Sequence, residues 1–235
     1  MHITAVELHP DRFPNTSQYP FSLPVLQNTR TIELPGPLTF LLGENGSGKS
    51  TVLRAISRRC GIHIWAEPPM GRVQRSPCED DLHQYLDVQW KEGEKPGAFF
   101  SAETYQHLSQ MIEEWASLDP NLLGYFGGKS LVSQSHGESF MSFFASRFVR
   151  EGVYLLDEPE SALSPRRQLA FVQLLQDMAR DGHAQFLIAS HSPILLSCPN
   201  AALLSFDGPA VAPVKFEDTD YCRVYRELLA DGAPS

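Results

Sequence analysis

The sequence predicts an α/β fold with a mostly parallel core sheet and an antiparallel β part near the N-terminus. Three observations predict it. Strand-like and helix-like segments alternate along most of the chain. Two strand-like runs, 152–156 and 186–189, are continuously apolar, as in strands that are covered on both faces. A glycine-rich segment, 43–48, lies between a strand-like run and a helix-like run.

In the N-terminal half, alternation predicts strands at 3–8, 31–34 and 85–90, and the apolar run 38–42 predicts another. A helix is expected after residue 49, because Val52, Ile56 and Cys60 recur every four residues. The helical spacing of Tyr105, Leu108, Ile112 and Trp115 predicts a second helix, over 102–118. Residues 62–100 are otherwise hard to read, and 121–133 are loop-like.

In the C-terminal half, Phe140, Phe144 and Phe148 mark a helix. The next helix is expected to begin at Pro165 and to end before Gly182. Its expected buried stripe is Leu169, Val172, Leu175 and Ala179. Edge strands are expected at 201–206 and 211–216, and an amphipathic helix at 221–229. The length of 235 residues suits one domain, 1–235, with a short helical lobe inserted within 62–150.

The charge balance argues against a surface built to coat nucleic acid. Lys and Arg number 19, Asp and Glu number 28, and the net charge is −9. The four cysteines are dispersed without a CxxC pair, which argues against zinc ribbons and favours reduced thiols. The N-terminus lacks the pattern of a signal peptide, and no apolar run reaches 18 residues. A cytoplasmic protein without an integral membrane segment is therefore expected.

The glycine-rich segment matches the pattern GxxxxGK[ST] between a strand and a helix, which is typical of a phosphate-binding loop. Glycines let backbone N–H groups converge on phosphate oxygens, and the helix N-terminus adds positive potential. Lys49 is predicted to contact the β- and γ-phosphates, and the hydroxyl of Ser50 to ligate Mg²⁺. The predicted nucleotide-binding residues here are Gly43, Glu44, Asn45, Gly46, Ser47, Gly48, Lys49, Ser50 and Thr51.

Polar residues follow each of the two buried strands. Asp157 and Glu158 end the run 152–156, where packing alone would not favour two carboxylates. We expect Asp157 in the Mg²⁺ shell and Glu158 as the base that orients or deprotonates the attacking water. His191 follows the run 186–189 and is expected to sense the γ-phosphate. The segment 135–139, SHGES, precedes a helix and could form an anion site, although alone it reads as an ordinary capped helix start.

Together these segments resemble a family. GENGSGKST, SHGES, YLLDEPESALSP and IASHSP occur in the order of an ABC-type P-loop ATPase, as Walker A, signature, Walker B with D-loop, and switch histidine. The resemblance spans about residues 30–200. The forms DEPES and SHGE look less like transporter subunits than like stand-alone ATPases related to recombination, repair and chromosome-maintenance ATPase heads. Residues 62–134 are too short and aperiodic for a long coiled-coil arm.

The resemblance implies ATP and Mg²⁺ as ligands and an ATP-dependent homodimer. It implies that Lys49 takes part in catalysis with Glu158 and His191, and that Thr51 joins the phosphate contacts. Ser135, Gly137 and Glu138 would close on the nucleotide of a second subunit. The D-loop would be 161–164, with Ser164 where Asp is common.

Two family features have no single match in this sequence. Gln84, Gln89 and the segment 99–103 are all candidates for the glutamine loop. Tyr19 and Phe21 are candidates for an aromatic that stacks on adenine, although both suit plain packing.

Three functions are compatible with these motifs. The favoured one is an ATP-hydrolysing switch that acts on an unidentified protein or nucleic-acid partner. The alternative is the nucleotide-binding subunit of an ABC transporter. A non-hydrolysing, nucleotide-gated module is disfavoured because Glu158 and His191 are both present.

Overall fold

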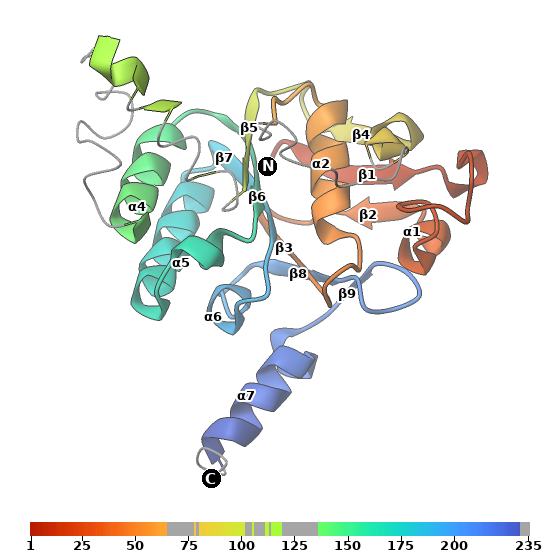
Figure 1. Cartoon of the computed structure of the whole chain (residues 1–235). Coiled ribbons are helices and arrows are strands. Elements are labelled where there is room, and N and C mark those ends of the chain that lie inside the picture. Colours follow the sequence, from red (N-terminus) through yellow and green to blue (C-terminus); the bar gives the residue numbers. More distant parts are fainter. Residues whose placement is uncertain are drawn as a thin grey trace.

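The computed structural model describes residues 1–64, 78, 80–101, 105, 111–112, 114–118 and 136–230. Within them, six strands form a sheet in the order β5-β6-β7-β3-β8-β9 (Figure 1). All pair in parallel except β9, which is antiparallel to β8. The strands are β3 (Leu38–Leu42), β5 (Gly97–Ser101), β6 (Gly152–Asp157), β7 (Ala184–Ala189), β8 (Ala202–Ser205) and β9 (Ala212–Pro213).

A smaller antiparallel sheet lies beside it, in the order β2-β1-β4. Its strands are β1 (Ile3–Leu8), β2 (Thr31–Glu33) and β4 (Leu86–Trp90). The fold class expected from the sequence is therefore confirmed: a mostly parallel sheet, with an antiparallel part near the N-terminus.

A buried glutamine joins the two sheets. Gln185 of β7 has no exposed surface, and its Oε1 accepts the backbone N–H groups of His2 and Ile3 at 2.7 Å each. Its Nε2 donates to the carbonyl oxygen of Ile3 at 2.8 Å. All three bonds hold the start of β1 against the central sheet.

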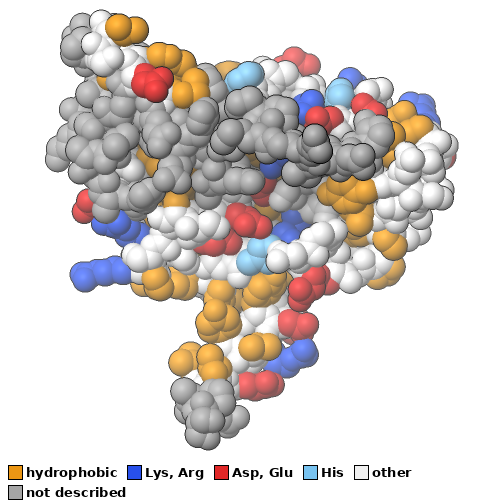
Figure 2. Space-filling model, in the orientation of Figure 1, with side chains coloured by type: hydrophobic (Ala, Val, Ile, Leu, Met, Phe, Trp, Pro, Cys, Tyr) orange, Lys and Arg blue, Asp and Glu red, His pale blue; other side chains and the backbone are white. Residues whose placement is uncertain are grey.

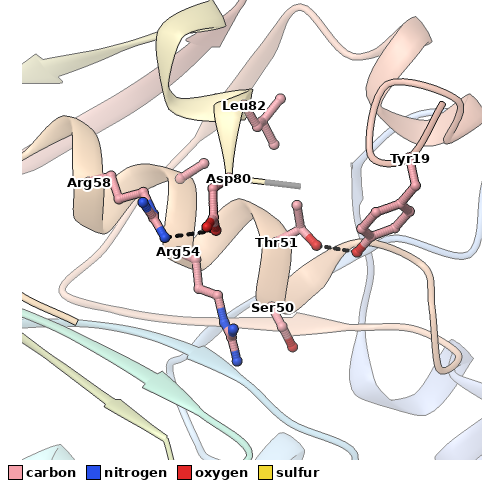
Figure 3. Close-up of a pocket in the computed structure, with 8 residues that line it drawn as sticks. Tyr19, Ser50, Thr51, Arg54, Arg58, Asp80 and Leu82 are labelled. Atoms are coloured by element: carbon pink, nitrogen blue, oxygen red, sulfur yellow. Dashed lines mark hydrogen bonds and ion pairs between the residues drawn. The ribbon is translucent and has the colours of Figure 1, made fainter. Parts of the chain in front are cut away.

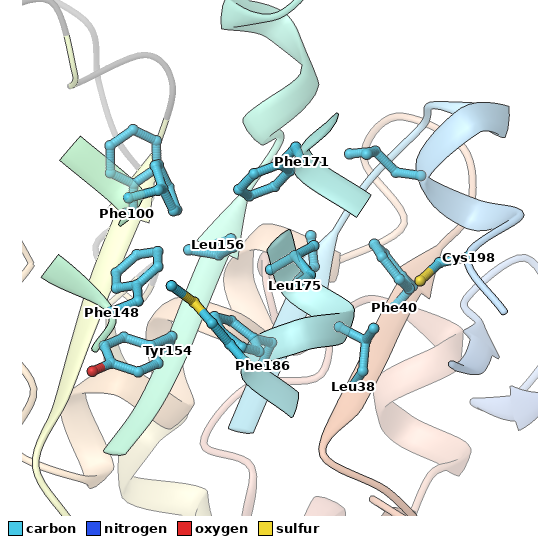
Figure 4. Close-up of a cluster of buried hydrophobic side chains, with 14 of the residues drawn as sticks. Leu38, Phe40, Phe100, Phe148, Tyr154, Leu156, Phe171, Leu175, Phe186 and Cys198 are labelled. Atoms are coloured by element: carbon cyan, nitrogen blue, oxygen red, sulfur yellow. The ribbon is translucent and has the colours of Figure 1, made fainter. Parts of the chain in front are cut away.

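Helices cover the parallel sheet on both faces (Figure 1). Helix α2 packs between one face of the parallel sheet and the small sheet, and α4 and α5 pack on the other face. Each face has its own buried core. Figure 4 shows the second core, where Phe171 and Leu175 of α5 pack over Tyr154 and Phe186 of the sheet. The α-helices described are α1 (Pro24–Asn28), α2 (Lys49–Arg59), α4 (His136–Arg147), α5 (Pro165–Arg180), α6 (Pro193–Leu196) and α7 (Asp220–Ala230). The 3-10 helices described are η1 (Pro10–Arg12), η2 (Asp81–Tyr85), η4 (Pro159–Ala162) and η5 (Phe216–Asp218).

The buried stripe expected for α5 is confirmed at Leu175, and Val172 and Ala179 pack partly buried against the same core, but Leu169 is wrong. Leu169 is 61% exposed, and the buried residues are Phe171, Leu175 and Met178. The bounds of α5 agree with the expectation: Pro165 begins it, and Gly182, with φ of +75°, follows its end. None of the described helices has the length and apolarity needed to cross a membrane.

Other differences concern segments with weak sequence signals. Strand β5 and helices α1 and α6 were not expected, and the expected strand at 211–216 is reduced to β9, followed by η5. Of the expected helix 102–118, the described residues at 111–112 and 114–118 are helical. The expected loop 121–133 lies outside the described residues.

Candidate nucleotide site

The three predicted motifs meet at one edge of the parallel sheet. Strands β6, β7 and β3 are neighbours, and Ala189 of β7 lies opposite both Asp157 and Leu41 in the register. Because parallel strands end at the same edge, the glycine-rich loop after β3, the carboxylates after β6 and the histidine after β7 lie together. This is the edge where open α/β sheets bind ligands.

The glycine-rich loop leads directly into α2, and its last glycine is required by its conformation. Gly48 has φ of +104°, in the left-handed region that side chains rarely adopt. A Cβ there would also lie 2.9 Å from Cδ1 of Leu23. The backbone at this point therefore approaches its surroundings as only glycine allows, and the N-terminus of α2 faces the loop.

Lys49 is buried and folds back over the loop. Its Nζ donates to the carbonyl oxygens of Gly43 at 2.7 Å and Glu44 at 2.9 Å, and to Oγ of Ser47 at 3.4 Å. Burial lowers the pKa of the Lys49 ammonium, against the opposing effect of nearby carboxylates led by Glu158. A charge held in this way, with neutral carbonyls as partners, fits a cation that exchanges them for phosphate oxygens.

Ser50 and Asp157 form a direct pair. The hydroxyl of Ser50 donates to Oδ1 of Asp157 at 2.7 Å, and Asp157 is buried. Burial raises the pKa of the Asp157 carboxyl, and the hydrogen bond from Ser50 opposes that effect. A hydroxyl and a carboxylate beside a phosphate loop are oxygen donors that suit Mg²⁺, which keeps several waters and binds substrate phosphates. Within the described residues no group of three or more His, Cys, Asp or Glu is arranged to hold a metal alone.

Glu158 occupies a strained backbone position. Its φ of +48° is in the left-handed region, which costs a glutamate about 1–2 kcal/mol. Its backbone N–H donates to the carbonyl oxygen of Ala189 at 3.0 Å, which holds the turn against β7. The side chain is 45% exposed, so water reaches it, and its Oε1 lies 3.6 Å from Nε2 of His191.

His191 is held by groups from two other segments. Its Nδ1 lies 2.9 Å from the hydroxyl of Tyr221 on α7, and its backbone N–H donates to Oε1 of Glu160 at 2.6 Å. Burial lowers the pKa of the imidazole, as does the charge of Lys49, while Glu158 opposes them. The Nε2 atom is buried and has no hydrogen-bond partner among the described residues. A ligand with negatively charged oxygens would supply one.

Glu160 is a residue that sequence reasoning missed. Besides the N–H of His191, its Oε1 accepts the hydroxyl of Ser190 at 2.8 Å and the N–H of Ser192 at 3.2 Å. Burial raises the pKa of this carboxyl, against the hydrogen bonds that it accepts. It therefore ties the turn after β6 to the turn after β7. Its place two residues after Glu158 was the available signal.

A pocket of about 140 Å³ adjoins the start of α2 (Figure 3). Ser50, Thr51 and Arg54 line it, and the hydroxyl of Tyr19 is hydrogen-bonded to that of Thr51. The Nε of Arg54 is buried without a partner among the described residues, so a second donor near the loop is free for an anion. Phe21 has no exposed surface and packs in the core, so it cannot present a face to adenine.

Comparisons with known proteins agree with these motifs. A profile described as "AAA domain, putative AbiEii toxin, Type IV TA system" matches residues 134–197, and one described as "AAA domain" matches 20–60. The manganese transport system ATP-binding protein MntA of Synechocystis is 26% identical, over 88% of this chain and 83% of its own. The hemin import ATP-binding protein HmuV of Bordetella avium is 28% identical, over 79% and 78%.

Solved structures show the same fold. An SMC head bound to the C-terminal winged-helix domain of ScpA aligns with a TM-score of 0.56 at 12% identity, over 92% of this chain and 99% of its own. The transporter component cbiO1 of Clostridium perfringens aligns with a TM-score of 0.52 at 17% identity, over 97% and 95%. These comparisons support an ABC-type P-loop ATPase.

The segment of the ATPase that resembles a signature motif is partly described. Ser135 lies outside the described residues, and Gly137 belongs to the first turn of α4. Glu138 is exposed and pairs with Arg167 of α5 at 3.1 Å. Helix α4 packs in the core on the opposite face of the sheet from α2, so the structure does not bring Gly137 or Glu138 to Lys49.

The candidates for the glutamine loop of the ATPase differ in whether they reach the site. Gln84 donates to Asp81 within η2, and Gln89 bonds to Glu7 within the small sheet, so neither reaches the site. In the segment 99–103, Ser101 ends β5 and lies opposite Asp157 in the register. That segment therefore reaches the site edge, although its last residues lie outside the described part of the chain.

The basic residues of the ATPase are mostly paired. Arg58 forms an ion pair with Asp80 at 2.7 Å, and Arg59 with Asp87. Arg167 pairs with Glu138, as noted above. Within the described residues these arginines therefore form no free basic stripe of the kind that tracks a nucleic-acid backbone.

Proposed function

We propose that this ATPase is a switch that binds ATP, dimerises on it, and acts on another protein or a nucleic acid. The observation that carries the proposal is the meeting of Lys49, Asp157, Glu158 and His191 at one sheet edge. Each supplies a different requirement of phosphoryl transfer: a cation, a metal ligand, a base and a contact for the terminal phosphate.

The contacts of each residue in the site indicate its role. Lys49 and the N–H groups of the loop bind the phosphates, and Ser50 with Asp157 would hold Mg²⁺. The ion would neutralise charge that develops on the phosphate oxygens. Glu158, reached by water, accepts a proton from the attacking water. His191 turns its unpartnered Nε2 toward the same space and, when both ring nitrogens are protonated, donates to the terminal phosphate.

The packing of the two halves of the machinery on opposite faces of the sheet supports dimerisation. The start of α4 carries the signature-like residues, yet α4 and α2 pack in cores on opposite faces of the sheet. Residues of α4 contribute to a nucleotide site if a second copy supplies them across an interface. A two-fold arrangement then buries two nucleotides and uses the same patch on both subunits.

The alternative is a transporter subunit. It is favoured by the relatives, several of which are ATP-binding proteins of import systems. Against it stand the SHGES and DEPES forms and the lack of a glutamine among the described residues at the end of β5. Recovery of the protein with a permease in the membrane fraction would favour the alternative.

The test uses Glu158→Gln, which keeps size and hydrogen bonding but cannot accept a proton. ATP turnover should fall by about 10²-fold or more while ATP still binds. With ATP and Mg²⁺ this variant should dimerise in light scattering after size exclusion, and with ADP it should stay monomeric. Turnover within twofold of wild type would place the base elsewhere, and a monomer at saturating ATP would exclude the dimer.

A second substitution tests the interface. Ser135→Arg, added to Glu158→Gln, places a bulky cation at the proposed interface and should abolish the dimer without weakening ATP binding. The control is Ser117→Arg in the same background, since Ser117 is exposed and hydrogen-bonds within its own turn. Equal dimerisation of both double variants would remove the signature assignment.

A further inference from the structure

Helix α7 reaches back to the nucleotide site through one hydroxyl. The helix projects away from the body of the molecule (Figure 1), and Cys222 is its buried residue. Near its first turn, the hydroxyl of Tyr221 lies 2.9 Å from Nδ1 of His191 and 3.2 Å from the carbonyl oxygen of Gly43. A single side chain thus contacts both the switch histidine and the first residue of the phosphate loop.

The start of α7 is itself well fixed. Thr219 is buried, its hydroxyl donates to the carbonyl oxygen of Phe216 at 2.6 Å, and it accepts the N–H of Cys222 at 3.2 Å. This is the arrangement of a helix N-cap. The position of Tyr221 is therefore set by the cap of α7 rather than by chance placement of a free side chain.

The direction of these bonds decides which ring nitrogen of His191 carries a proton. The carbonyl oxygen of Gly43 can only accept, so the hydroxyl of Tyr221 donates to it. The hydroxyl oxygen is then an acceptor, and Nδ1 of His191 must be the donor. The opposite direction would place two lone pairs against each other between Tyr221 and Gly43. The neutral ring is thereby fixed with Nδ1–H on Tyr221 and Nε2 3.6 Å from Glu158, and Nε2 can donate to a phosphate oxygen when the ring takes up a second proton.

We propose that Tyr221 is a positioning residue: it fixes the ring orientation and tautomer of His191, and it links α7 to the nucleotide site. The value of that link for turnover rests on the proposed function, in which His191 contacts the terminal phosphate. The geometry of the link is independent of the proposed function. A displacement of α7 that reaches its first turn moves Tyr221 away from His191 and Gly43 together, and frees the ring to turn.

The surroundings of α7 leave room for such displacement. A cleft of about 470 Å³ lies between α7 and the strand that leads into the phosphate loop, lined by Leu42, Val214 and Val224 among others. Apolar side chains gather on the projecting helix (Figure 2), and Leu229 is 80% exposed. Helix α7 is thus anchored at its capped end, and its exposed end can transmit a displacement to the histidine.

The test compares Tyr221→Phe with Tyr225→Phe, which changes a half-exposed tyrosine on the same helix. The first readout is ¹⁵N NMR of the nucleotide-free protein labelled at histidine, with the His191 signal assigned by its loss in His191→Gln. The shifts of a neutral imidazole distinguish Nδ1–H from Nε2–H. Wild type and Tyr225→Phe should show Nδ1–H, and Tyr221→Phe should show Nε2–H or a mixture.

The second readout is the kinetics of ATP hydrolysis. Tyr221→Phe should lower kcat by about tenfold and change KM less than twofold, because orientation and not binding is lost. Unchanged His191 shifts in Tyr221→Phe would overturn the inference whatever the activity. Altered shifts in a protein whose wild type does not hydrolyse ATP would uphold the positioning role and remove the proposed function.

Discussion

The charged ammonium group of Lys49 has only neutral hydrogen-bond partners among the described residues. Its Nζ is held by two carbonyl oxygens and a hydroxyl, and burial lowers the pKa of the ammonium. Carbonyl oxygens are weaker partners for an ammonium than phosphate oxygens. The lysine is thus solvated by its own loop until a more strongly charged acceptor arrives.

Lys49→Ala should therefore reduce ATP affinity by about tenfold or more, a loss of ~1.4 kcal/mol. Calorimetric titration with ATP checks it. Lys95→Ala is the matched control, since Lys95 pairs with Glu151 at the opposite end of the sheet and should leave affinity unchanged. Equal affinities in the two variants would contradict the assignment of the loop.

The glutamate of η4 connects two elements that are far apart in the sequence. Glu160 receives three hydrogen bonds from 190–192 while burial raises the pKa of its carboxyl. The folded protein therefore holds this proton more tightly than the unfolded chain does. The contribution of Glu160 to the free energy of unfolding is present at low pH and is lost as pH rises through the raised pKa.

Glu160→Gln removes that titration. The difference in unfolding free energy, wild type minus Glu160→Gln, should fall as pH rises from about 4.3, the usual glutamate pKa. Glu151→Gln gives the opposite slope, because the hydrogen bond from Lys95 lowers the pKa of Glu151 and its contribution is lost as pH falls. Urea unfolding across the pH range measures both. If both differences in unfolding free energy changed with pH in the same direction, the raised pKa assigned to Glu160 would be contradicted.

At the scale of elements, sequence patterns predicted the features that are encoded in short, contiguous motifs. The glycine-rich loop, the strand-end carboxylates and His191 each stand in a short motif, and the fold places these motifs at one edge. The roles assigned to them stay predictions. The partners Glu160 and Tyr221 were missed because only the fold brings them to His191.

Errors in the elements have similar causes. Strand β5 was missed because its five residues, GAFFS, lie in a segment without a clear period and pair with a strand more than fifty positions later. Leu169 was wrongly assigned to the buried stripe of α5 because apolar residues occur on more than one side of the helix. Contact with the sheet selects Phe171 and Met178, and it leaves Leu169 in solvent.

At the scale of the whole molecule, the two sheets are joined by a polar contact inside the core. Gln185 satisfies His2 and Ile3 with three hydrogen bonds, and no part of it is exposed. An apolar residue at this position could pack, but it would leave the backbone groups of β1 without partners. Such unsatisfied buried groups cost about 1–3 kcal/mol each.

Gln185→Ala should lower the free energy of unfolding by about 2–4 kcal/mol. Urea unfolding measures the loss. The control is Gln173→Ala, because Gln173 is exposed and makes one bond, to Asp177 at 3.0 Å, so its loss should stay within about 0.5 kcal/mol. A loss of that small size for Gln185→Ala would show that the sheets are not joined through this amide.

The place of β3 in the sheet has a consequence for synthesis on the ribosome. Both of its neighbours, β7 and β8, come from residues 184–205, although β3 itself ends at Leu42. A nascent chain carries the glycine-rich loop long before it carries the strands that hold that loop in place. Such long-range pairing forms late, after the loop-closure entropy has been overcome. We therefore expect the loop to bind nucleotide only after translation has passed β8, so that partly synthesised chains do not compete for ATP.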